Sequence, residues 1–98
     1  MKNKNPKILE FKKELVAVFS KLPRDRESVF LLLKDILTPS EFETLALRWQ
    51  IVKKLKKGDD QRSIAGELRL GLGTVTRGSR MLRNKKGGFH LMLEKLGE

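Results

Sequence analysis

The sequence contains no cysteine and only one histidine in 98 residues. The absence of cysteine excludes disulfides, thiolate catalysis and cysteine-based zinc sites. A lone histidine also leaves no cluster of side chains suited to a metal centre or to a nucleophile and its base. We therefore expect no metal cofactor and no enzymatic activity, and we interpret His90, next to Phe89 in a predicted helix, as a structural residue.

Long apolar runs are also missing. No apolar stretch is longer than residues 29–33, which are far too short to cross a bilayer. The N-terminal string MKNKNPK is basic, but no apolar segment of the kind found in secretion signals follows it. We expect a cytoplasmic protein with no membrane contact. The length suits a single domain over residues 1–98, of which residues 1–6 are predicted to form a disordered arm.

Acidic residues are scarce in the second half of the chain. Residues 48–98 contain thirteen basic and five acidic side chains, a net charge of +8, whereas residues 1–47 have a net charge of +2. From Arg69 to Lys86 there are six basic side chains and no acid. Such a block favours a polyanionic partner, because each Lys or Arg on a phosphate releases a condensed counterion. A simpler explanation is that the basic residues only keep the protein soluble. The concentration of the charge in one part of the chain makes this explanation weaker.

The apolar residues recur at helical spacing and almost nowhere alternate, which predicts an all-α fold of about six short helices. The predicted helices cover residues 6–20, 24–37, 39–57, 60–68, 72–83 and 89–96. The string Thr38-Pro39-Ser40-Glu41 is typical of a capping box before the third helix, and Gly58 of its left-handed stop. Asp59 or Asp60 can cap the fourth helix. The third helix has two apolar faces, as expected at the centre of a fold or between subunits.

Residues 60–83 have the pattern of a helix-turn-helix, with the turn at residues 69–71. Apolar and small side chains are spaced to fill the wedge between two crossing helices. In this motif the second helix enters the major groove, and the side chains left on its outside here are short, polar or basic: Gly73, Thr74, Thr76, Arg77 and Arg80. Many such turns carry glycine where this chain has Arg69, which therefore requires a positive φ or a shifted turn. Two helices of an ordinary bundle are the structural alternative.

Two stretches resemble the Trp repressor family. LTPSEFETLALRWQIVKKLKKG (residues 37–58) resembles the family's long central helix, and QRSIAGELRLGLGTVTRGSRMLR (residues 61–83) resembles its helix-turn-helix. The string TVTRGS, residues 74–79, is close to a family signature. The resemblance covers about half of the chain. It implies a transcriptional repressor that forms an intertwined homodimer and binds double-stranded DNA at a palindromic site.

The resemblance also implies which residues meet DNA. It places Leu72, Gly73 and Thr76 at base edges, often through water. It places Gln61 and Arg62, at the start of the preceding helix, on a phosphate or a flanking base. Charge alone, rather than resemblance, adds four cations that we expect near phosphates: Arg80, Arg83, Lys85 and Lys86.

L-Tryptophan is the corepressor that the resemblance implies. The two arginines that sandwich the indole ring match Arg48 and Arg77, and the glycine that lets the ring approach matches Gly78. Contacts to the amino and carboxylate groups would fall on the Leu37 carbonyl and on Thr38. A ligand in this slot would fix the angle of the recognition helix, provided that it binds the DNA-competent state better than the other state.

Some positions leave alternatives open. Met81 stands where the family has a serine, and it cannot accept a hydrogen bond from an ammonium as a hydroxyl can. Asp35 replaces an apolar residue, and could either pair with an ammonium or spoil the site. Arg48 could simply pair with Glu41 or Glu43 on the helix surface. The first alternative function is thus a ligand-independent DNA-binding protein on the same fold. The second is a basic RNA- or ribosome-associated helical module, against which the scarcity of aromatic side chains argues.

Overall fold

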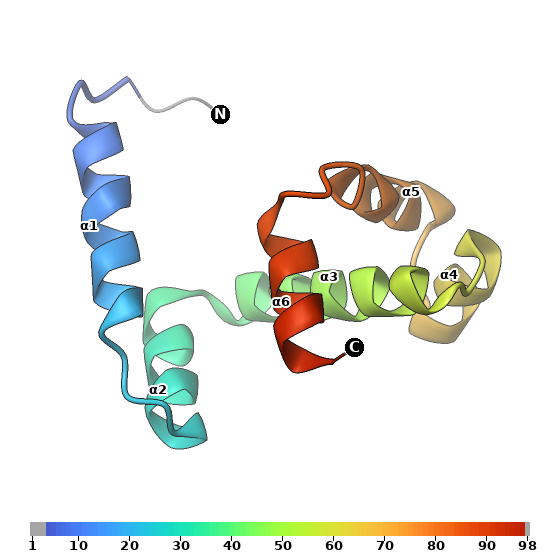
Figure 1. Cartoon of the computed structure of the whole chain (residues 1–98), viewed down its shortest axis with the longest axis horizontal. Coiled ribbons are helices and arrows are strands. Elements are labelled where there is room, and N and C mark those ends of the chain that lie inside the picture. The colour runs from blue at the N-terminus through green and yellow to red at the C-terminus, as the bar shows by residue number, and fades with distance from the viewer. Residues whose placement is uncertain (1–3, 98) are drawn as a thin grey trace. The chain divides into compact units, whose positions relative to one another are not determined.

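The computed structural model describes residues 4–97, which contain six α-helices and no strand (Figure 1). The prediction of an all-α fold of about six helices is confirmed. The chain divides into two compact units, and the boundary in the sequence falls between Thr38 and Pro39. Residues 1–3 of the predicted arm lie outside the described part of the chain. Just before the first helix, the backbone N–H of Lys7 donates to Asn5 Oδ1 (2.8 Å) in a turn. No described helix is both long enough and apolar enough to cross a membrane.

The N-terminal unit consists of α1 (Ile8–Ser20) and α2 (Arg26–Ile36). Helix α2 begins two residues later than the sequence predicted, because the Asp25 carboxylate caps it by accepting from the backbone N–H of Ser28 (2.7 Å). This hydrogen bond lowers the pKa of Asp25. Neither helix contains a buried residue. In the single chain, the apolar faces of both helices are therefore exposed to solvent.

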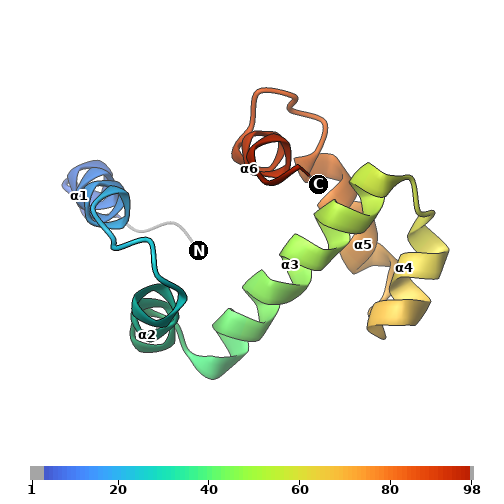
Figure 2. The same cartoon turned by 60° about the horizontal axis from the view of Figure 1, so that its bottom comes forward.

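The C-terminal unit consists of α3 (Pro39–Lys57), α4 (Gln61–Leu68), α5 (Leu72–Met81) and α6 (Gly88–Leu96). Helices α4 and α5 pack against the C-terminal half of α3 (Figures 1 and 2). One buried residue from each of these three helices forms the core: Ile51, Ile64 and Val75. Four partly buried side chains surround them: Leu55, Ala65, Leu68 and Leu70. The core thus fixes the helix pair α4–α5 on α3.

The connection from α3 to α4 follows the sequence prediction. Gly58 ends α3 with a φ of 102°, a left-handed conformation that costs glycine little. Asp60, rather than Asp59, caps α4 by accepting from the backbone N–H of Ser63 (2.9 Å). The Ser63 hydroxyl donates to the second carboxylate oxygen of Asp60 (2.9 Å). These bonds lower the pKa of Asp60, since both favour its charged form.

A ring contact and a hydrogen bond are among the contacts that join helix α6 to the rest of its unit. The rings of Trp49 on α3 and Phe89 on α6 stack with centroids 6.5 Å apart. The Nε2 atom of His90 lies 2.7 Å from the carbonyl oxygen of Leu82, just after α5. His90 therefore helps to hold the loop between α5 and α6.

Candidate functional site

A left-handed residue makes the sharp turn between α4 and α5. Arg69 has φ 56° and ψ 46°, so of the two alternatives left open by the sequence, a positive φ or a shifted turn, the chain adopts the positive φ. The turn is closed by the backbone N–H of Leu70, which donates to the carbonyl of Ala65 (2.9 Å). Gly71 then precedes α5 in an extended conformation. The two helices consequently cross rather than continue, as a helix-turn-helix requires.

Helix α5 presents three kinds of surface around its axis. Val75 and Gly78 face inward and are buried. A second side, which includes Arg77, faces the pocket described below. Four residues at helical spacing form the outer side, which we call the reading face: Leu72, Gly73, Thr76 and Arg80. Leu72, Gly73 and Arg80 are exposed, and Thr76 is half-buried.

The remaining predicted DNA contacts lie at the ends of the two helices. Gln61 and Arg62 form the first turn of α4, where Gln61 is half-buried and Arg62 exposed. Arg83 is exposed in the turn after α5. Helix α5 ends two residues earlier than predicted, because the backbone N–H of Leu82 donates to the nearer carbonyl of Ser79 (3.2 Å). Lys85 and Lys86 are also exposed.

Gly73 and Gly78 are both helical, but the space around them differs. A Cβ atom added to Gly78 would lie 2.5 Å from Cγ2 of Ile51, so α5 can approach α3 this closely only without a side chain here. A Cβ added to Gly73 would meet no atom within 4 Å. Packing inside the chain therefore explains Gly78 but not Gly73, although glycine costs roughly 1 kcal/mol in a helix relative to alanine. The same is true of Gly66 on α4, where an added Cβ would also meet no atom within 4 Å.

Two cross-helix contacts were not predicted from the sequence. The Thr76 hydroxyl on α5 lies 2.7 Å from Oε1 of Gln61 on α4. Lys54 on α3 donates to Glu67 on α4 (2.7 Å), and this ion pair lowers the pKa of Glu67. Both contacts join residues at least thirteen positions apart. Only the crossing of the helices brings them together, so no local pattern could have indicated them.

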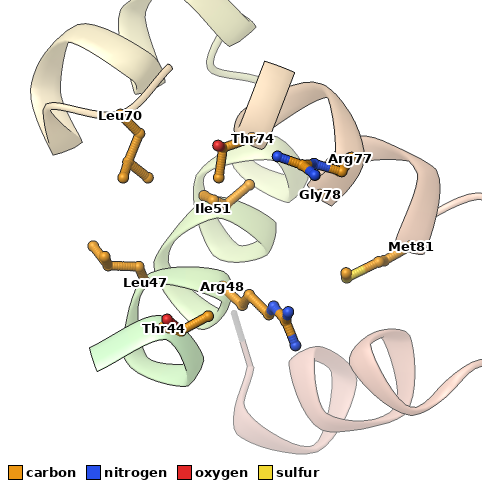
Figure 3. A pocket seen from close by; sticks show the side chains of 9 residues that line it. All are labelled: Thr44, Leu47, Arg48, Ile51, Leu70, Thr74, Arg77, Gly78 and Met81. Atoms are coloured by element: carbon orange, nitrogen blue, oxygen red, sulfur yellow. The ribbon is translucent and has the colours of Figure 1, made fainter. Parts of the chain in front are cut away.

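A pocket of about 280 Å³ lies between α3 and α5 (Figure 3). Figure 3 shows Arg48 reaching in from α3 and Arg77 from α5, with the Met81 side chain extending between them. Of the residues predicted to hold a ligand, Arg48, Arg77 and Gly78 line this pocket together. Leu37 and Thr38 belong to the other unit and stay predictions. The other lining residues are Thr44, Leu47, Ile51, Leu70 and Thr74.

The chemistry of the pocket suits a small aromatic or apolar acid. Its floor is aliphatic, with Leu47, Ile51 and Leu70 among the lining side chains. Its only charged side chains, among the nine described residues that line it, are the two guanidinium groups. A guanidinium can stack on an aromatic ring and pair with a carboxylate at the same time. The volume of about 280 Å³ is slightly below the range of roughly 300–1,000 Å³ that is usual for small-molecule pockets.

The family model described as Trp repressor protein matches residues 12–97. The chain belongs to the Trp repressor family. Three relatives named Trp operon repressor homolog illustrate the relationship. That of Vibrio parahaemolyticus is 37% identical over 79 residues, which cover 76% of this chain and 77% of the relative. That of Vibrio vulnificus is 41% identical over 69 residues, or 69% and 68% of the two chains. That of Vibrio campbellii is 40% identical over 62 residues, or 62% of each chain.

No solved structure matches the chain significantly. The match to the Trp repressor family extends well beyond the residues that carried the resemblance, since it includes most of α1 and all of α6. Membership of this regulatory, non-enzymatic family makes the chain a repressor-type regulator.

Proposed function

We propose that the protein is a homodimeric, sequence-specific repressor that binds double-stranded DNA through α5, with L-tryptophan as the corepressor in the pocket between α3 and α5. The observation that carries this proposal is the reading face. It contains an otherwise unexplained helical glycine, Gly73, within a stretch of the chain that has six basic and no acidic residues. A helix of this kind can lie close against a groove while its flanking cations neutralise phosphates.

The contacts divide into those that position the helix and those that specify the sequence. Arg62, Arg80 and Arg83 are exposed around α4 and α5, where their charge suits phosphate contacts. Leu72 and Thr76 lie on the reading face beside Gly73, where an apolar side chain and a hydroxyl can meet base edges. The Ile51–Ile64–Val75 core packs both helices against α3.

The pocket provides a physical route from ligand binding to DNA binding. It touches α5 at Thr74, Arg77, Gly78 and Met81, on the side away from the reading face. A ligand between α3 and α5 would therefore set the position of α5 without occupying its DNA-binding side. The ligand favours DNA binding only if it binds more tightly to the protein with α5 in the DNA-binding position than with α5 in another position. The difference between these two affinities sets the size of the effect.

Dimerisation is proposed from the apolar surface that the single chain leaves exposed. Val16 of α1 is 67% exposed, and Phe30 and Leu31 of α2 are more than half exposed. Soluble monomers rarely expose large contiguous apolar areas. We propose that a second copy of the chain covers these faces, and that residues 1–98 then act as a single domain.

The test combines selection of duplexes from a random pool with titration of L-tryptophan. The proposal predicts enrichment of one palindromic sequence, bound more tightly when tryptophan is present. Arg77→Ala is expected to weaken both ligand and DNA binding. Equal affinity for all duplexes, or for RNA at the same salt concentration, would contradict the proposal. A selected sequence together with no heat on adding tryptophan would favour the ligand-independent alternative, in which Met81 fills the slot.

A further inference from the structure

The hydrogen bond between α4 and α5 determines what Thr76 can offer to DNA. The Thr76 hydroxyl oxygen lies 2.7 Å from Oε1 of Gln61 and 3.0 Å from the carbonyl oxygen of Leu72. Both neighbours are acceptors, whereas a hydroxyl has a single hydrogen to donate. That hydrogen is therefore used within the protein. Toward a base, Thr76 can contribute only its methyl group and the lone pairs of its oxygen.

The same bond determines what Gln61 can offer. Its amide oxygen accepts from Thr76, so the group left to bind another molecule is the amide nitrogen with its two N–H donors. Gln61 is half-buried in the first turn of α4, where its oxygen is held against α5. A glutamine that recognises adenine uses its oxygen and its nitrogen together on one base. With its oxygen turned inward, Gln61 cannot make that bidentate contact.

We propose that Gln61 and Thr76 recognise DNA as one unit, in which Thr76 orients the Gln61 amide so that its N–H groups meet a base that presents an acceptor. In the major groove only the keto bases present acceptors without an amino donor beside them, guanine with O6 and N7 and thymine with O4, whereas adenine presents N7 next to its amino group. The inference rests on the proposed function, because it requires that the α4–α5 pair binds duplex DNA. Within that function it assigns Gln61 the readout and Thr76 the positioning.

The experiment measures affinities for a set of duplexes in which each position of the selected half-site is changed between a keto and an amino base. The unmodified protein is expected to prefer a keto base at one position by about ten-fold. Gln61→Ala should remove that preference, and Thr76→Val, which keeps the shape but lacks the hydroxyl, should remove it at the same position. Thr76→Ser, the matched control, should retain it. Thr76→Val combined with Gln61→Ala should lose no more than either change alone.

Gln61→Glu gives an independent readout if Thr76→Val does not fold. A carboxylate still accepts from Thr76 but has no N–H donor, so the preference should reverse toward cytosine or adenine. The inference is overturned if Thr76→Val and Gln61→Ala act at different bases, or if Thr76→Val leaves the keto preference intact. Failure of the proposed function looks different, because the unmodified protein would then show no base preference at any position, and the inference would fail with it.

Discussion

Gly78 is the residue on which the close approach of α5 to α3 depends. An alanine Cβ would lie 2.5 Å from Cγ2 of Ile51, which is only 1% exposed and belongs to the core. We expect Gly78→Ala to lower the free energy of unfolding by about 1–2 kcal/mol, because the overpacking exceeds the roughly 1 kcal/mol gained in helix propensity. Urea unfolding measures this loss. Adding Ile51→Leu removes the branched methyl group and should restore most of it, and an additive double variant would contradict this explanation.

Arg69 occupies a conformation that a side chain makes unfavourable. Its φ of 56° places it in the left-handed region, where non-glycine residues are strained by about 1–2 kcal/mol. Arg69→Gly should therefore raise the free energy of unfolding by about 0.5–1 kcal/mol after the entropic cost of glycine. Arg69→Ala is the matched control, since it removes the charge but keeps the strain. If both variants were equally stabilised in thermal melts, relief of charge repulsion rather than of backbone strain would be the cause.

At the scale of a single helix, α4 begins at a cap that depends on pH, because the capping group is the Asp60 carboxylate. The hydrogen bonds from Ser63 lower the pKa of Asp60 below its ordinary value of 3.8. The folded state therefore binds the proton less readily than the unfolded state. The stabilisation is fully present above about pH 4 and is lost as the pH falls through the lowered pKa.

This dependence can be measured with Asp60→Asn. Asparagine is also a good N-cap but does not titrate, so at pH 7 the variant should keep most of the stability. Urea midpoints measured from about pH 2.5 to pH 7 should fall less steeply in acid for Asp60→Asn than for the unmodified protein. Parallel curves would show that the cap does not contribute to acid unfolding. The remaining slope is expected from Asp25 and Glu67, whose pKa values are lowered in the same direction.

The helices could be predicted from the sequence because their ends are local signals. Gly58 and Asp60 mark the loop between α3 and α4, and both act as their residue types suggest. Asp25, three residues before Ser28, carried a similar signal that the predicted start of α2 overlooked. The early end of α5 could not be foreseen, since the chain tightens over residues 79–83, which contain no glycine or proline.

The site was predicted less completely than the helices. The meeting of Arg48, Arg77 and Gly78 in one pocket follows from family resemblance, not from spacing, because these residues lie on two helices. The pairs Gln61–Thr76, Lys54–Glu67 and His90–Leu82 depend on how helices cross or return. Periodicity specifies which face of a helix is apolar, but not the angle at which that face meets the next helix.

The single chain leaves more of its large apolar side chains exposed than it buries. Within residues 4–97, fifteen large apolar side chains are exposed, nine of them before Thr38. We predict a stable dimer in solution, with twice the chain mass of 11.3 kDa at micromolar concentration. Sedimentation equilibrium tests this. Val16→Asp on α1 should shift the population toward monomer, whereas Lys12→Asp, a charge change at an already polar position, should not. A monomer at all concentrations would contradict the prediction.

The function proposed for the whole molecule requires that α5 lies against DNA through its reading face. Gly73 and Gly66 allow a matched test, because an added Cβ meets no atom within 4 Å at either helical position. Neither alanine variant should lose stability, since each gains helix propensity. Affinity for the selected duplex, measured at one fixed salt concentration, should fall by at least about ten-fold, or ~1.4 kcal/mol, for Gly73→Ala. For Gly66→Ala it should stay within about two-fold, since Gly66 lies on α4, outside the reading face. Equal affinities for the two variants would contradict the placement of α5 on DNA.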